Sequence, residues 1–181
     1  MNKTFVALVA GGTMLGMAAC SATRTQRSAG EQIDDATVLT GVKAALVQND
    51  VTEAGEINVD VNRGVVKLSG FVDTPKEKSA AADVARGVDG VQSVQNDITV
   101  GDKSSTPGEI VDDSVITAKV KAALIENSET KAHQINVETS AGVVQLSGFV
   151  DDASAKDAAA TVAKSVTGVK DVKNELSVKS Y

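Results

Sequence analysis

The stretch GVVKLSGFVD at residues 64–73 returns as GVVQLSGFVD at residues 142–151, 78 positions later. At the same offset, DDATVLTGVKAAL from Asp34 returns as DDSVITAKVKAAL from Asp112. A repeat of this length is large enough to form a globular unit, unlike the shorter repeats of solenoids. The sequence therefore predicts two tandem copies of one domain, at residues 34–100 and 112–178, joined by a linker with Gly and Pro at residues 101–111.

Each copy has the same predicted order of helix, strand, strand, helix, strand. In the first copy, apolar residues at helical spacing follow Asp34 and Asp35, which we expect to cap the helix. Alternating apolar residues on both sides of a tight turn predict a hairpin over residues 57–72. A capping Thr74 followed by Pro predicts the second helix, and residues 91–100 are expected to form the last strand.

We predict an α+β fold in which each copy forms a small three-stranded mixed sheet with both helices on one face. Gly70 and Gly148 are expected on the helix side, where a missing side chain lets the second helix approach. The other face of each sheet is polar apart from Phe71 and Phe149. These rings are expected either under the second helix or in a contact between the copies, which would enlarge two small cores.

The strand positions expected in the two cores share an apolar side chain on the helix-facing side of the sheet. They are Ile57, Val59, Leu68, Val94 and Ile98 in the first copy, and Ile135, Val137, Leu146, Val172 and Leu176 in the second.

The first 20 residues, MNKTFVALVAGGTMLGMAAC, have the pattern of a secretory signal peptide. Their apolar segment is short and contains two glycines, so it is too weak for a permanent membrane helix. The run from Met17 to Cys20 resembles the bacterial lipobox, in which the cysteine is acylated after cleavage. We therefore predict a lipoprotein signal peptide at residues 1–19 and a lipidated Cys20. The alternative is cleavage at an ordinary small-residue site, which would leave a soluble periplasmic protein.

The residues after the cysteine indicate where the anchor would be held. In the lipoprotein sorting pattern an Asp at this place favours the inner membrane, and the chain has Ser21 instead. This predicts the periplasmic face of the outer membrane, with soluble periplasm as the alternative. Residues 20–33 are polar after the cysteine and are expected to form a flexible tether.

Composition excludes several classes of function. The chain has 181 residues with 18 basic and 24 acidic side chains, a net charge of −6, so it lacks the basic surface of a nucleic-acid binder. Aromatic residues make up only 2% of it, which leaves little for bases or sugars to stack on. One cysteine and one histidine are too few for a disulfide framework or a Cys/His zinc site. We expect no cofactor and no metal.

The motifs GVVKLSGFVD and VDGVQSVQN, with GVVQLSGFVD and VTGVKDVKN in the second copy, resemble the BON domain, named after bacterial OsmY and nodulation proteins. The resemblance covers residues 34–178. The whole arrangement is similar to dual-BON outer-membrane lipoproteins, with OsmY-like soluble periplasmic proteins as relatives. The resemblance implies a non-catalytic envelope protein linked to stress resistance and outer-membrane integrity, whose domains bind phospholipid or other envelope components.

The residues themselves give no catalytic set. His133 is expected in a surface loop without a nucleophile to activate. The repeated carboxylates Asp34 and Asp112, and Asp73 and Asp151, lie at predicted helix starts, where capping accounts for them.

The second copy is the less acidic one, with seven basic against ten acidic residues, compared with six against eleven in the first. A lysine close to an anionic membrane contributes about 1 kcal/mol of binding. The lysines predicted to contact a membrane or a partner are Lys119, Lys121, Lys164, Lys170 and Lys173. The alternative is a solvated surface of mixed charge, and the shortage of aromatic residues argues against interfacial insertion.

The leading hypothesis is therefore a non-enzymatic, lipid-anchored periplasmic protein that supports the outer membrane by binding phospholipid or envelope proteins. The alternative is a soluble OsmY-like periplasmic protein of osmotic stress, or a chaperone for unfolded clients. An enzyme is a third hypothesis, which turnover that depends on His133 would support.

Overall fold

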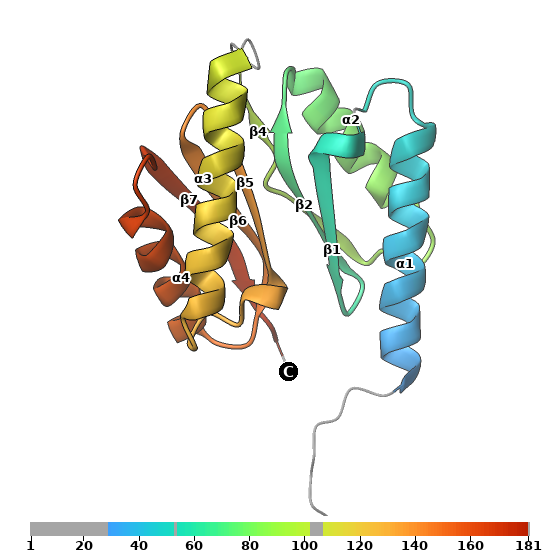
Figure 1. The fold of residues 1–181 in the computed structure, drawn as a ribbon. Helices are drawn as coiled ribbons and strands as arrows, with labels where there is room; N and C mark the ends of the chain where they lie inside the picture. Colours follow the sequence, from blue (N-terminus) through green and yellow to red (C-terminus); the bar gives the residue numbers. More distant parts are fainter. Residues whose placement is uncertain (1–28, 53, 102–106, 181) are drawn as a thin grey trace, which may run out of the picture.

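The computed structural model describes residues 29–52, 54–101 and 107–180 (Figure 1). The predicted signal peptide and Cys20 lie outside the described residues. Both predicted domains are present as α+β units with the expected order of elements, which confirms the predicted fold class. We refer to them as repeat 1 and repeat 2.

The elements of the two repeats correspond one to one. Repeat 1 contains α1 (Ala29–Gln48), the short 3₁₀ helix η1 (Ala54–Glu56), β1 (Ile57–Asn62), β2 (Val65–Val72), α2 (Pro75–Arg86), β3 (Ser93–Asn96) and β4 (Thr99–Val100). Repeat 2 contains α3 (Pro107–Glu126), η2 (Ala132–Gln134), β5 (Ile135–Ser140), β6 (Val143–Val150), α4 (Ala153–Ser165) and β7 (Asp171–Val178).

Each sheet is mixed, with the hairpin antiparallel and the last strand parallel to its centre. In repeat 2 the order is β5-β6-β7, and Leu146 of the central β6 lies opposite Val137 and Asn174. In repeat 1 the edge strand beside β2 is divided into β3 and β4, because pairing breaks at Asp97 and Ile98. The continuous strand predicted for residues 91–100 is therefore shorter and interrupted, whereas repeat 2 keeps an unbroken one.

Both helices of each repeat cover one face of its sheet, and each repeat has its own apolar core. Leu68 and Leu146 are fully buried at the centres of the two cores. Eight of the ten predicted core positions are buried, and the other two, Val94 and Val172, are partly buried against the same clusters. The period-2 alternation thus assigned the faces of the strands correctly.

The first helix of each repeat is longer than predicted. Helix α1 begins at Ala29, inside the segment predicted as a tether, and α3 begins at Pro107, inside the predicted linker. As a result Asp34 and Asp112 lie within their helices and do not cap them, which corrects the sequence-based assignment. Asp35 also lies within α1 and does not cap it. Its carboxylate instead accepts hydrogen bonds from the backbone N–H groups of Arg63 and Gly64, at 2.8 and 2.9 Å, and so fixes the hairpin turn to the helix.

Repeat 2 makes the same connection at the same place. The Asp113 carboxylate accepts from the backbone N–H groups of Ala141 and Gly142, at 2.7 and 2.8 Å. Arg63 and Ala141 both have a positive φ in these turns, so their N–H groups point away from the strand ladder. A buried carboxylate that accepts two backbone N–H groups stabilises a turn conformation that these residues rarely adopt.

The glycines in the central strands are required for a different reason from the predicted one. Gly70 and Gly148 both have a φ of 124°, and a Cβ at either would lie 2.1 or 2.2 Å from the backbone carbonyl oxygen of Glu56 or Gln134. The close approach is therefore made by the backbone just before the first strand and not by the alanines of the second helix. Any side chain at these positions would clash with main chain.

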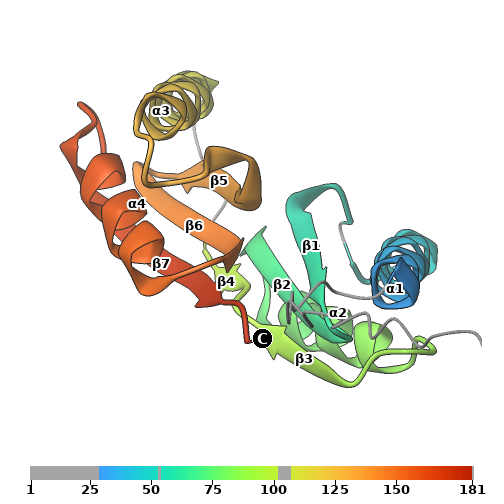
Figure 2. The same cartoon turned by 90° about the horizontal axis from the view of Figure 1, so that it is seen from below.

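The two repeats pack sheet against sheet, with the helices outside (Figure 2). The faces that the sequence left open thus cover each other, and the molecule has four layers of helices, sheet, sheet and helices. Phe71 belongs to neither apolar core and lies on this inner side, in agreement with the alternative that places the ring between the copies.

Replacement of Leu146 by Ala is expected to lower the free energy of unfolding by about 2 to 5 kcal/mol, because it removes a fully buried side chain and leaves a cavity. Chemical denaturation with both variants measures the loss. Ile125→Ala, which truncates a side chain that is 74% exposed, is the control and should leave stability within about 0.5 kcal/mol of the wild type. Equal effects of the two substitutions would contradict the assignment of the core.

Candidate functional site

The surface between the repeats, which we call the inter-repeat face, is made of polar side chains from both sheets. Lys67 and Gln145 are each only 2% exposed there, and Ser69 and Ser147 are equally buried. Buried polar groups cost free energy unless they are hydrogen-bonded, so the partners of these side chains determine whether the two sheets can stay together.

The hydrogen bonds of the inter-repeat face follow an approximate two-fold symmetry. At its centre the hydroxyl of Ser69 donates to that of Ser147, its counterpart at the 78-residue offset, at 2.6 Å. On one side Asn58 donates to the Glu138 carboxylate at 2.5 Å.

On the other side of the centre, Asn136 donates to the Asp60 carboxylate at 2.7 Å. Asn136 is the counterpart of Asn58, and Asp60 is the counterpart of Glu138. Corresponding residues of the two repeats therefore exchange the same contact in both directions, as in the interface of a symmetric dimer.

Burial affects the charge of Asp60. Removal from water raises the pKa of the Asp60 carboxyl above its usual value, against the opposing effects of the hydrogen bond from Asn136 and the charges of Lys43 and Lys67. At neutral pH, burial of the ionised Asp60 between the sheets therefore costs free energy of folding.

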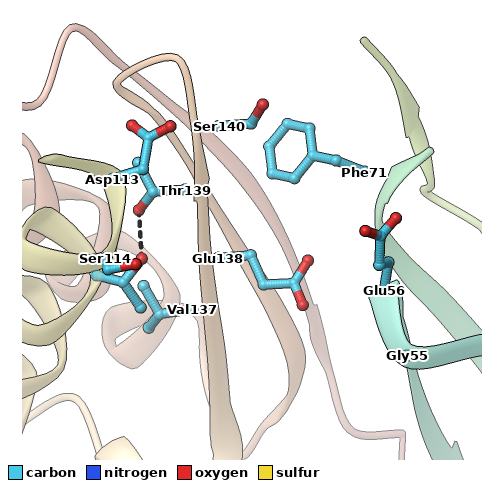
Figure 3. A pocket seen from close by; sticks show the side chains of 10 residues that line it. Gly55, Glu56, Phe71, Asp113, Ser114, Val137, Glu138, Thr139 and Ser140 are labelled. Carbon is cyan, nitrogen blue, oxygen red and sulfur yellow. Dashed lines mark hydrogen bonds between the residues drawn. The ribbon is translucent and has the colours of Figure 1, made fainter. Parts of the chain in front are cut away.

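A cavity of about 530 Å³ opens beside the inter-repeat face (Figure 3). The side chains of Glu56 and Phe71 enter it from repeat 1, and Glu138 faces them from β5 of repeat 2. The hydroxyl of Thr117 donates to that of Thr139 at 2.7 Å on the far wall. Carboxylates beside an aromatic ring suit a cationic group, and the open shape of the cavity gives no sign of a catalytic centre.

A second surface lies on the outer side of α3. Val115 and Ile125 are 45% and 74% exposed, and Ala118 and Ala122 between them are exposed as well. Their spacing places the four on one stripe of the helix. The counterparts in α1 are Thr37, Thr40, Ala44 and Val47, so repeat 2 has the more apolar stripe.

Lys119 and Lys121 lie on either side of this stripe, and two further exposed lysines come from the end of α4 and the loop after it. Lys119 and Lys170 are exposed and line one groove of about 300 Å³, next to Val115, although they are 51 positions apart in the sequence. Lys121 is exposed farther along α3, and Lys164 is exposed in the last turn of α4. The stripe and these four lysines form what we call the α3 surface.

The fifth predicted lysine does not belong to the α3 surface. Lys173 is half-buried and donates to the hydroxyl of Thr99 in repeat 1 at 3.3 Å. Side chains alternate between the two faces of the sheet along β7. Val172 and Leu176 point into the core of repeat 2, so Lys173 points to the opposite side, toward repeat 1.

The other candidate groups have structural roles or none that the structure shows. Thr74 caps α2 as predicted, and its hydroxyl accepts from the Glu77 N–H at 3.2 Å. In repeat 2 the cap is Asp152, whereas Asp151 binds Lys131 and Lys179, which lower its pKa to about 2.

His133 lies exposed in η2. Among the described residues, no group of three or more acidic, His or Cys side chains is arranged to hold a metal ion. Within that same part of the chain, no helix combines the length and the apolar character needed to cross a membrane.

These features define a class of protein: a tandem α+β module whose repeats bind each other through polar sheet faces and carry their helices on the outside. The model of the BON domain matches residues 34–102 and 112–180. The chain therefore belongs to the BON family, as its motifs indicated.

Known proteins of similar sequence extend over most of the chain. It is 37% identical over 194 residues to the osmotically-inducible protein Y of Escherichia coli (strain K12), covering 99% of this chain and 96% of that protein. It is 36% identical over 168 residues to the outer membrane lipoprotein DolP of Haemophilus influenzae, covering 92% and 84%. It is also 40% identical over 147 residues to a 21 kDa hemolysin of Actinobacillus pleuropneumoniae, covering 81% and 75%. Its relationship to the first two agrees with the prediction of a non-enzymatic protein.

The raised pKa of Asp60 predicts how stability depends on pH. Because the folded state binds this proton more tightly than the unfolded chain, Asp60 favours folding below its folded pKa and disfavours it above. At pH 7 the Asp60→Asn variant should therefore melt at the same temperature as the wild type or at a higher one. As the pH falls toward 4, its stability should increase less than that of the wild type. Melting curves of both proteins across this range measure the difference.

The exposed Asp50→Asn variant serves as the control and should follow the wild-type profile. A marked loss of stability of Asp60→Asn at pH 7 would mean that the hydrogen bond from Asn136 outweighs the cost of burial.

Proposed function

We propose that this protein is a non-catalytic binding protein of the bacterial envelope that acts under osmotic stress in the periplasm. The observation that carries this proposal is the similarity to osmotically-inducible protein Y over nearly the full length of both chains. The two independent cores and the outward-facing helices support a binding role, since they leave rigid helical surfaces free for partners.

A second candidate is a lipid-anchored form at the periplasmic face of the outer membrane. Two observations favour it: the lipobox-like run that ends at Cys20, followed by Ser21, and the similarity to the outer membrane lipoprotein DolP. Acylation of Cys20 by two or more chains would suffice as a stable anchor.

A strain without the gene tests both candidates, when complemented with the wild type or with Cys20→Ala. The osmotic-stress proposal predicts that loss of the gene reduces survival after a hyperosmotic shift and that the wild type restores it. The anchored form further predicts that the wild type pellets with outer membranes while Cys20→Ala stays in the soluble fraction.

A wild-type protein found wholly in the soluble periplasm would reject the anchor and leave the first candidate standing. Unchanged survival without the gene would reject the first candidate.

For either form we propose that the α3 surface makes the contact with anionic phospholipid. Its exposed apolar stripe can enter the interface while Lys119, Lys121, Lys164 and Lys170 remain at the level of the phosphates. Both repeats are net acidic, so attraction has to be local, within a screening length of about 8 Å. Lys173 is left out because it faces repeat 1.

Reversal of charge at Lys119 and Lys121 should weaken binding of residues 21–181 to anionic liposomes by about tenfold or more, since each lysine contributes about 1 kcal/mol. Co-sedimentation at several salt concentrations measures the loss, which should shrink as salt is added. The matched control reverses Lys43 and Lys76, two exposed lysines of repeat 1. Equal losses from both pairs, or no binding by the unmodified chain, would exclude the α3 surface.

A further inference from the structure

The inter-repeat face joins two corresponding surfaces, one from each repeat. Because the two surfaces are similar, each could also bind a second copy of itself. The contact between the counterparts Ser69 and Ser147 lies at the centre of the approximate two-fold symmetry. The same two-fold symmetry relates the hydrogen bond from Asn58 to Glu138 to the one from Asn136 to Asp60. Repeat 1 could therefore pair with another repeat 1, and repeat 2 with another repeat 2, unless particular side chains prevent it.

The symmetry is broken most clearly at one buried pair of counterparts, Lys67 and Gln145. The side chain of Gln145, in repeat 2, forms hydrogen bonds with backbone groups of repeat 1. Its amide oxygen accepts from the Gly70 N–H at 2.7 Å, and its amide nitrogen donates to the Asp97 carbonyl at 2.7 Å.

Lys67 has a different set of partners. Its ammonium group pairs with the carboxylate of Asp97 in its own repeat and donates to the Ser177 hydroxyl of repeat 2 at 3.1 Å. The side chain of Gln95, at 3.5 Å, completes its surroundings. The buried charge is thus neutralised within repeat 1 and is hydrogen-bonded across the interface, which is the arrangement a buried ion requires.

A pair of like repeats would lose contacts that Lys67 or Gln145 makes in the native pair. In a pair of two repeats 1, a second lysine would replace Gln145, and an ammonium group cannot accept the hydrogen bond of Gly70 N–H. Both ammonium groups would also be buried in the same face. In a pair of two repeats 2, glutamine would replace Lys67, so the hydrogen bond that the ammonium group donates to the Ser177 hydroxyl would be lost. Glu175 is the counterpart of Asp97 in repeat 2, and Gln145 stands there in place of a lysine that could pair with it.

We infer that Lys67 and Gln145 are the residues that determine specificity in the inter-repeat face, so that each repeat binds the other kind of repeat and not its own. The partner selected in this way is the second repeat of the same chain. The short connection between Val100 and Pro107 keeps it at a high effective concentration, so the molecule closes on itself.

The full-length pair of repeats tests this inference with Gln145→Lys, Lys67→Gln and the double exchange. Gln145→Lys removes the acceptor of the Gly70 N–H and adds a second ammonium group to the face, so it should separate the repeats: the radius of gyration should rise, and amide exchange at Gly70 should accelerate by about tenfold or more. Lys67→Gln removes one charge and should lower the melting temperature without separating the repeats.

The double exchange moves the lysine to repeat 2, where Glu175 can pair with it, and returns an amide to the opposite side. It should therefore recover a large part of the stability lost in the single variants, a non-additive result. The same exchange at Gln92 and Lys170, an exposed pair of counterparts, is the control and should be additive with no change in size.

Far-UV circular dichroism distinguishes separated repeats from unfolded ones, because each repeat has its own core. If Gln145→Lys does not fold at all, recovery in the double exchange still decides the question. Additive losses in the double exchange, or a Gln145→Lys variant with wild-type size and wild-type protection of Gly70, would overturn the inference.

Discussion

The hydrogen-bonded contact between the two sheets is the constraint on which the rest of the structure depends. A three-stranded sheet with both helices on one face leaves its other face to water, and a repeat of this size has little apolar surface to bury. Here the remaining faces cover each other, centred on Ser69 and Ser147. The contact is polar and holds a buried lysine, so its stability depends on complete pairing of donors with acceptors more than on apolar area.

The same requirement explains why the sequence predicted some features and not others. Alternation along a strand is a local signal, and it assigned Leu68 to the core and Ser69 to the opposite face correctly. It could not show what Ser69 would meet, because the register between two sheets is set only in the folded chain. The partners of Lys67 and Lys173 across the interface could not be predicted for that reason.

For two residue types, the sequence indicated a special contact but led to the wrong contact partner. An acidic residue before an apolar run is typical of a helix cap, yet Asp35 serves as a tertiary acceptor for the hairpin turn, because the helix continues upstream of it. A glycine within a strand indicates a close approach, and Gly70 has one, but to the carbonyl of Glu56 and not to a helix. In both cases the residue type pointed to a special contact, and its repetition at Asp113 and Gly148 supported this. The identity of the partner required the fold.

Closure of the sheets also determines where any other molecule can bind. Because the strand faces are used within the chain, an envelope partner has to contact the helices, the loops or the cavity beside Glu138. The helices are not equivalent, since the outer stripe of α3 carries Val115 and Ile125, and α1 has Thr37 and Val47 at these places. Duplication thus supplied one surface to hold the repeats together, and divergence of the outer helices left repeat 2 with the more apolar, lysine-bordered face. Internal pairing and the binding that we propose for the α3 surface use opposite sides of the same sheet, so a substitution could change one without the other.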